Sequence, residues 1–385
     1  MNFFEVLVQE AKLIFTDVAI VLTIVGGVVF YSFLYPQPYE KESVSGLSVS
    51  VVDLDKSDVS RDIIYKLNTT PQVDITRQDM SERDAKEALE ATLVKAIVII
   101  PAHFKRDIAL GKSPTIAVGA DSSYFLIYGA VLEGAMKSVL TASVKLKVAN
   151  LLKANIPLSS AKDAYTPYTI NAINLFNKNN SYTEYVVPAV FILILQQTLL
   201  IGLGILGGGV NERRTRGEYL HFKEAKTYQV MLSRYLIFGT LFFVHMLFYF
   251  GFSYELFGIV HVAKMSELLT FGTVFITAVI AFGLFLGALF SSREIATPVI
   301  LFSSLPLVFS VGFIWPIEAI PDLVRYLSYI SPSTPAIKGF LELNQMGADF
   351  NAVLPSYTIL LTQIVVYTIL GYYFINKNRK TNEQI

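Results

Sequence analysis

The chain has 385 residues, of which 53% are hydrophobic and 16% are charged, whereas soluble globular domains carry about 25% charged residues. This composition identifies a membrane protein. The 31 basic residues balance the 31 acidic ones, so the overall charge does not indicate a nucleic acid or an acidic substrate as partner. The chain has no cysteine, which excludes a disulfide framework, a thiolate nucleophile and a cysteine metal site.

The first segment, 1–17, precedes a long apolar stretch. Its pattern FFEVLVQEAKLIF at 3–15 predicts an amphipathic helix on the inner, cytosolic face of a membrane. The apolar stretch 18–35 could be mistaken for a signal peptide. However, three acidic residues and a single basic one, Lys12, precede it, and no small-residue cleavage site follows. We therefore interpret 18–35 as a retained transmembrane helix.

Six stretches without Lys, Arg, Asp or Glu are long enough to cross a hydrocarbon core of about 30 Å, which takes about 20 helical residues. They are 18–35, 185–206, 235–254, 268–290, 295–315 and 353–375. Because lipid offers no hydrogen-bond partner, each must satisfy its own backbone as a helix. The predicted fold class is an α-helical integral membrane protein with six transmembrane helices, five of them within 185–375.

The polar block 36–184 lies between the first two predicted spans and has the pattern of a folded domain. We expect strands at 47–53, 73–76, 96–101, 115–120 and 169–176. We expect helices after the capping residue Ser57, after Ser81 with Asp84 in capping-box relation, over 102–110 and over 122–153. Strands that alternate with helices predict a small α/β domain.

Two short motifs in this block resemble ligand sites but lack required residues. DLDKSD at 53–58 resembles the beginning of a calcium loop, yet Asp58 stands at the glycine position and Ile64 at the glutamate position. GKS at 111–113 resembles the end of a phosphate loop, yet Arg106 stands where glycine is needed. We interpret the first as a strand end and helix cap, and the second as a helix stop. We therefore expect no metal site here and no nucleotide site in the chain.

The distribution of basic residues predicts the orientation, because Lys and Arg favour the cytosolic side. The side that would hold both termini carries eleven: Lys12, Arg213, Arg214, Arg216, Lys223, Lys226, Arg234, Arg293, Lys377, Arg379 and Lys380. The short connections on the other side, 255–267 and 316–352, carry only Lys264, Arg325 and Lys338. We therefore expect 207–234 and the tail 376–385 to be cytosolic and 36–184 to be extracytoplasmic.

Few polar side chains interrupt the predicted spans. Strongly polar residues there are Gln196, Gln197, His245 and Gln363, and the lack of charged groups argues against a proton relay. Gln196 and Gln197 could line a path or bond to a neighbouring helix. His245 could be satisfied by a carbonyl or hydroxyl within the bundle or could act as a titrating switch.

Small residues and an irregular connection complete the membrane part. Two glycine pairs at fourfold spacing, Gly204 with Gly208 and Gly283 with Gly287, permit close helix contact. The segment 316–352 is too apolar for a free loop and is interrupted by several prolines. We expect it to form two short helices at the outer interface. The aromatic residues expected at headgroup level are Trp315, Tyr326 and Tyr329.

With these pieces placed, the chain resembles the permease subunits of ABC-2-type transporters, in the multidrug-exporter-like subfamily with a large extracytoplasmic domain. The segments that carry the resemblance are 49–67, 96–114, 172–190, 211–220 and 330–348. Their order and spacing extend the resemblance over nearly the whole chain. No motif identifies the transported compound, so drugs, lipids and other amphiphiles all stay open.

The resemblance implies that a separate ATPase docks from the cytosol against the N-terminal helix and the segment after the second span. Its coupling surface on this chain would comprise Asn211, Glu212, Arg213, Arg214, Arg216, Gly217 and Glu218. ATP and Mg²⁺ would be bound by the ATPase and not by this chain. Two permease chains, identical or related, would enclose the path. Taken alone, the arginines could equally be a topology anchor.

Two functions of different class follow. The main hypothesis is a permease subunit for efflux of a hydrophobic or amphipathic compound across the cell inner membrane, with a periplasmic adaptor as a further partner and membrane lipid around it. The alternative is a membrane-anchored receptor or envelope assembly protein whose outer domain binds a ligand or partner. An enzyme is the weakest reading, because no nucleophile, base and orienting acid stand in recognisable spacing.

Overall fold

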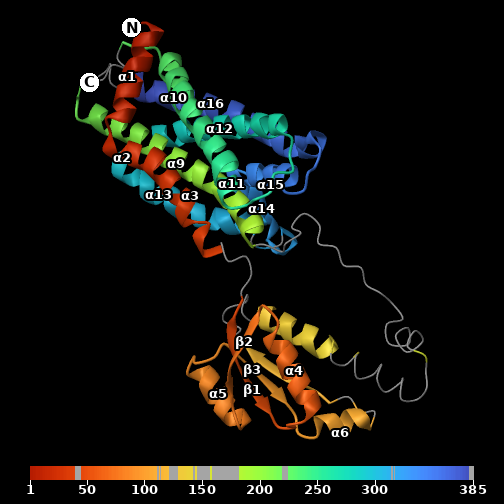
Figure 1. Ribbon diagram of the computed structural model, residues 1–385. Helices are drawn as coiled ribbons and strands as arrows, with labels where there is room; N and C mark the ends of the chain where they lie inside the picture. The colour runs from red at the N-terminus through yellow and green to blue at the C-terminus, as the bar shows by residue number, and fades with distance from the viewer. Residues whose placement is uncertain are drawn as a thin grey trace. The chain divides into compact units, whose positions relative to one another are not determined.

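The computed structural model describes residues 1–39, 45–110, 112, 114–120, 129–141, 144, 157, 182–218, 224–313, 315 and 317–380. The chain forms two compact units (Figure 1). The helical unit combines Met1–Glu40 with Asn174–Ile385, and the α/β unit is formed by Lys41–Ile173 between them in the sequence.

The six stretches predicted to cross a membrane are helical over most of their length; the fifth, 295–315, is helical as far as Ser310. The helical unit contains α1 (Phe3–Phe15), α2 (Val18–Val21), η1 (Leu22–Gly27), α3 (Val28–Leu34), η2 (Gln37–Tyr39), α9 (Tyr182–Thr215), α10 (Thr227–Leu247), η4 (Phe248–Ser253), α11 (Tyr254–Leu256), α12 (Met265–Leu289), α13 (Arg293–Ser310), η5 (Ile317–Ala319), α14 (Asp322–Ser328), α15 (Ser333–Asn344), η6 (Phe350–Val353) and α16 (Leu354–Lys380).

Not all of these helices meet the length and composition expected of a span. Among the described residues, four do: Val186–Thr215, Thr227–Leu256, Met265–Leu289 and Phe350–Arg379. The pair Phe3–Phe15 and Val18–Leu34, bent by 78°, adds a fifth if it counts as one broken span. The helix α13 is not among them; it carries Arg293 and Glu294 in its first turn and two prolines inside. The protein is therefore helical with several apolar helices, and the count of six stays a prediction.

The helix α9 is the centre of the helical unit. In its most apolar window 94% of residues are buried, against 22% for α16. Glycines allow this central position, because a Cβ added at Gly207 would lie 2.4 Å from the carbonyl oxygen of Gly287. One added at Gly208 would lie 2.3 Å from the carbonyl oxygen of Ser292. The backbones of α9, α12 and the turn after α12 therefore touch.

The two glycine pairs that the sequence singled out lie at these contacts. A Cβ at Gly204 would approach Ala296 to 3.0 Å, and one at Gly283 would approach Leu203 to 2.6 Å. The predicted close helix contacts are confirmed, since only a residue without a side chain fits at such distances.

The segment 316–352 differs from expectation in one of its two short helices. Around α14, Trp315 is 57% exposed and Tyr326 67% exposed, as expected of aromatic residues at an interface. In contrast, α15 is buried along most of its length, and Gly339 touches the ring of Phe271 from α12. The helix α15 is therefore a packed part of the bundle, because its apolar residues occupy several faces instead of one.

The α/β unit contains one four-stranded sheet with the order β2-β1-β3-β4. Its elements are β1 (Leu47–Asp53), α4 (Asp58–Asn68), β2 (Val73–Gln78), α5 (Glu82–Glu90), β3 (Ala96–Ile100), α6 (Phe104–Ala109) and β4 (Ala117–Ala120). β1 pairs in parallel with β2 and β3, and β4 runs antiparallel to β3. The strand expected at 169–176 lies outside the described residues, and within 122–153 residues 129–141 and 144 are helical.

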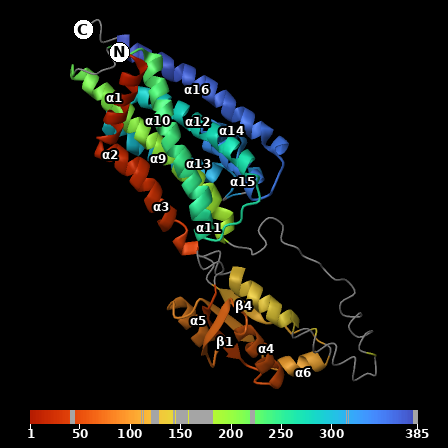
Figure 2. The same ribbon diagram turned by 45° about the horizontal axis from the view of Figure 1, so that its top comes forward.

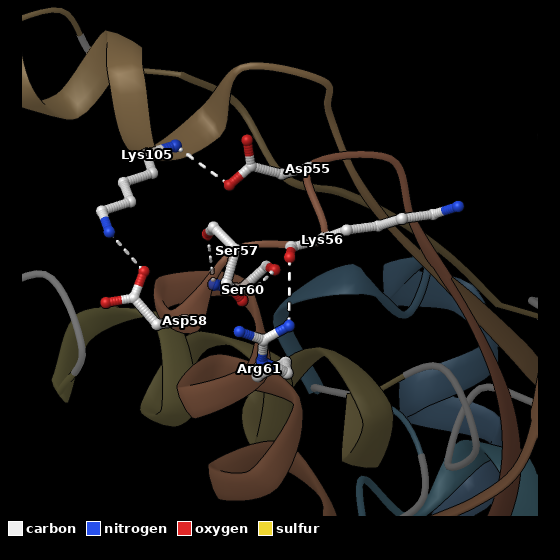
Figure 3. Close-up of polar contacts among 7 residues, drawn as sticks. All are labelled: Asp55, Lys56, Ser57, Asp58, Ser60, Arg61 and Lys105. Atoms are coloured by element: carbon white, nitrogen blue, oxygen red, sulfur yellow. Dashed lines mark hydrogen bonds and ion pairs between the residues drawn. The ribbon is translucent and has the colours of Figure 1, made fainter.

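The turn after β1 resembles the beginning of a calcium loop in sequence, but its side chains bond to neighbouring groups of the protein (Figure 3). Asp53 Oδ1 accepts hydrogen bonds from the backbone amides of residues 55 and 56 at 3.1 and 2.9 Å. Ser57 caps α4. Asp55 Oδ2 accepts the amide of Lys105 at 3.1 Å. The ammonium of Lys105 donates to Asp58 and lowers the pKa of that carboxyl. The interpretation as a strand end and helix cap is confirmed.

Candidate functional site

Polar contacts gather at one end of the helical unit, which we call the basic end. It comprises α1, the beginning of α2, the turn between α12 and α13, the last turns of α9 and α16, and the beginning of α10. The labelled N-terminus lies there in Figure 2. Most of the basic residues that decided the predicted orientation belong to these segments.

The segment 207–234, expected to be a coupling loop, is mostly helical. α9 continues to Thr215 and α10 begins at Thr227, while 219–223 lie outside the described residues. The glycines do not end α9, because they are the positions at which it contacts α12. Gly217, with a φ of +73°, follows the helix instead, as expected of a glycine at a helix C-terminus.

Asn211 departs from its expected place on the coupling surface. It is only 7% exposed, and its Nδ2 donates to the carbonyls of Ala288 at 3.2 Å and Phe290 at 2.8 Å. Asn378 of α16 donates to the same Ala288 oxygen at 2.8 Å. The last carbonyls of a helix have no partner within it, so the two asparagines satisfy the end of α12. Asn211 therefore holds helices together and is not a surface residue.

The other expected coupling residues do lie at the end of α9. Arg216, Gly217 and Glu218 are exposed, and Arg216 pairs with Glu212 one turn earlier. Arg213 is half-buried. Arg214 donates to the backbone carbonyl of Asn378, so it ties α9 to α16.

Two ion pairs at the basic end connect helices far apart in the sequence. Glu10 of α1 and Arg234 of α10 meet at 2.8 Å, with side chains 0% and 6% exposed. Asp17, which caps α2, meets Arg293 of α13 at 3.0 Å. In the sequence, Glu10 and Asp17 argue only against a signal peptide, and Arg234 and Arg293 count only towards the orientation. The only local signal of the first pair is an acid, Glu10, among the apolar positions of an amphipathic helix. Its partner Arg234 lies 224 positions further along the chain.

A cavity of about 220 Å³ lies beside the pair Asp17–Arg293. It is lined by Leu13, Asp17, Ile20, Ile205, Leu206, Gly209, Val210, Glu212, Arg213, Arg216, Glu218 and Arg293. Four of the expected coupling residues therefore face one polar cavity together with the ion pair that joins α2 to α13.

The predicted pathway residues lie elsewhere. Gln196 is 2% exposed, and its Nε2 donates to the hydroxyls of Ser331 at 2.8 Å and Ser333 at 3.1 Å, just before and at the beginning of α15. Gln197 is half-buried. His245 is 6% exposed, and its Nδ1 has no hydrogen-bond partner among the described residues. The contacts of Gln196 favour its helix-to-helix interpretation; a pathway role for the three stays a prediction.

A central buried helix, several apolar helices around it and a polar end that gathers α1 with the last turns of α9 and α16 define a helical membrane protein. The chain matches the family model of the ABC-2 family transporter protein over residues 18–373, and it belongs to that family. The resemblance inferred from the sequence is thereby confirmed, and the chain is a transport permease of this family.

Two curated relatives are similar over almost their whole length. The inner membrane transport permease YhhJ of Escherichia coli (strain K12) is 23% identical over 375 residues, which cover 94% of this chain and 93% of the relative. The protein of the same name from Shigella flexneri matches with the same identity and coverage. Both names agree with a transport permease embedded in a membrane.

Proposed function

We propose that this chain is the permease subunit of an ATP-driven ABC exporter that moves a hydrophobic or amphipathic compound, drug-like or lipid, outward across the inner membrane. Membership of the ABC-2 family supports a transport role. The sequence contains no phosphate loop, so a separate ATPase would bind ATP and Mg²⁺ and supply the energy.

The observation that carries the proposal is that the arginines of the basic end lie at the C-terminal end of α9. Arg213 stands on the last turn of α9, and Arg216 follows directly after it; α9 is the most deeply buried of the candidate spans. A displacement applied there would reach every helix packed on α9, among them α12, α13 and α15. Guanidinium groups suit a polar, reversible protein contact. We assign the docking surface to Glu212, Arg213, Arg216, Gly217 and Glu218.

The proposal includes an arrangement in the membrane. Both termini and the basic end face the cytosol, and the α/β unit lies on the other side, where a periplasmic adaptor could bind it. Two permease chains, identical or related, would form the path between them. The excess of basic residues at the basic end supports this orientation.

The docking surface is tested by replacing Arg213 and Arg216 together with Ala. Arg214 is left in place because it bonds to the backbone of α16. We expect the variant to reach the membrane but to lose the ATPase during affinity purification from native membranes. The matched control replaces Lys264 and Arg325, basic residues on connections at the opposite end of the helices, and should retain the ATPase. Undiminished co-purification with the Arg213→Ala/Arg216→Ala variant would contradict the assignment.

A further inference from the structure

The cavity at the basic end has walls of two kinds. Its apolar wall is formed by Leu13, Ile20, Ile205, Leu206 and Val210, and its charged wall by Asp17, Glu212, Arg213, Arg216, Glu218 and Arg293. The apolar wall belongs to segments that continue into the membrane-spanning stretches. A lining that changes from apolar to charged within one cavity is expected at the depth where acyl chains give way to lipid headgroups.

Most charges on the charged wall neutralise each other. Asp17 pairs with Arg293 at 3.0 Å, and Glu212 pairs with Arg216. Among the described residues, the side chains of the remaining two, Arg213 and Glu218, form no ion pair. They stand together, because the amide of Glu218 donates to the carbonyl of Arg213 at 3.1 Å. The cavity therefore offers one cation and one anion to an occupant.

The size of the cavity restricts that occupant. Sites that enclose a whole drug-sized ligand have volumes of about 300–1,000 Å³, and this cavity holds about 220 Å³. It suits a polar headgroup better than a transported compound. Val18 and Leu22 do not line the cavity; their side chains are 79% and 68% exposed, so α2 and η1 present apolar groups on the face that points away from it.

We propose that this cavity binds the headgroup of a zwitterionic phospholipid that carries a phosphate and a primary ammonium, as phosphatidylethanolamine does. Arg213 contacts the phosphate, and Glu218 contacts the ammonium. The acyl chains leave the cavity along its apolar wall. A purely anionic headgroup would match Arg213 but would bring its charge towards Glu218 without compensation.

The bound lipid would join four helices. Lining residues come from α1, α2, α9 and α13, so the headgroup would fill the space between the bent N-terminal pair and the end of the central helix. This inference requires only that the chain is embedded in a membrane. Arg213 and Glu218 also belong to the proposed docking surface, so lipid binding is measured on the chain alone and ATPase binding separately by co-purification.

The test uses the purified full-length chain without any ATPase. Native mass spectrometry would count bound lipid after titration with phosphatidylethanolamine or phosphatidylglycerol of identical acyl chains. We expect the wild-type protein to prefer phosphatidylethanolamine by about fivefold, which corresponds to about 1 kcal/mol, the upper range for a partly exposed ion pair. Glu218→Gln should remove this preference, and Arg213→Gln should weaken binding of both lipids. Lys264→Gln, an exposed cation at the opposite end, should change neither.

Three results would overturn the proposal. The first is equal binding of the two lipids by the wild-type protein. The second is a preference that survives Glu218→Gln, a replacement on an exposed residue that leaves the packed helices intact. The third is the absence of bound lipid from the chain alone together with a cross-link from residue 218 to an ATPase, which would show that a protein segment fills the cavity.

Discussion

The two ends of the helical unit are held together by different kinds of contact. At the basic end the helices are joined by ion pairs, Glu10 with Arg234 and Asp17 with Arg293, and by the amide of Asn211 on the end of α12.

The other end, which we call the α15 end, comprises 254–265 and 315–354. Among the described residues, the hydrogen bonds that join other helices to α15 and the turn before it are between neutral groups. Gln196 donates to Ser331 and Ser333, and Gln363 of α16 donates to the carbonyl of Tyr329 at 2.7 Å. Neutral groups need less compensation when they leave water. We therefore expect single contacts at the basic end to contribute much to stability, and single contacts at the α15 end to contribute little.

The largest effect is expected for the buried ion pair. Glu10→Leu leaves Arg234 without its carboxylate, and breaking a buried pair in this way costs about 3–5 kcal/mol. We expect a large loss of thermal stability of the purified protein in detergent. The double variant Glu10→Leu/Arg234→Leu should regain most of it, because apolar side chains then replace both members of the buried pair.

The control for that prediction is an exposed pair at the α15 end. Lys264 and Glu267, with side chains 74% and 23% exposed, should contribute no more than about 1 kcal/mol. Equal losses from Glu10→Leu and Lys264→Ala would break the comparison between the two ends.

An intermediate effect is expected at Asn211. Asn211→Leu removes the side-chain donor to the carbonyl of Phe290, while Ala288 keeps the donor of Asn378; leaving a buried carbonyl without its donor costs about 1–3 kcal/mol. Hydrogen exchange should increase locally at residues 286–292. Asn351→Leu, at an exposed position on η6, is the matched control. Unchanged exchange at the end of α12 would show that Asn211 does not hold it.

The smallest effect is expected at Gln196. Hydrogen bonds between membrane helices contribute about 0.6 kcal/mol on average and at most about 1.7, and Ser331 and Ser333 keep their own contact at 2.9 Å. Gln196→Leu should therefore lower stability slightly and leave export unchanged. A strong loss of export with normal stability would return Gln196 to the pathway, and Gln197→Leu tests the neighbouring position in the same assay.

The sequence predicts best what depends on local pattern. Apolar stretches of about 20 residues are helical, because a backbone in lipid must satisfy its own hydrogen bonds. The alternating segment 47–53 forms β1, because alternate residues of a strand face opposite sides of the sheet. The continuation of α9 through 207–215 was not foreseen, since glycines and charges there resemble a loop. They serve instead as a helix contact and a helix end.

The partners within the candidate site could not be predicted, because they are distant in the sequence. Glu10 and Arg234 are 224 positions apart, and Asn211 reaches carbonyls 76 to 79 positions away. From the sequence alone, a polar residue such as Asn211 beside several charged residues can be solvent-exposed or bonded to the end of another helix. That is why Asn211 was assigned to a surface and found buried.

The account depends on the basic end facing the cytosol, and one labelling experiment tests this directly. Because the natural chain has no cysteine, single replacements give unambiguous signals: Arg216→Cys at the end of α9 and Lys86→Cys on α5, both at exposed positions. A membrane-impermeant maleimide added to intact spheroplasts should label Lys86→Cys at once and Arg216→Cys only after the membrane is opened. Labelling of Arg216→Cys in sealed spheroplasts, with Lys86→Cys protected, would contradict the account.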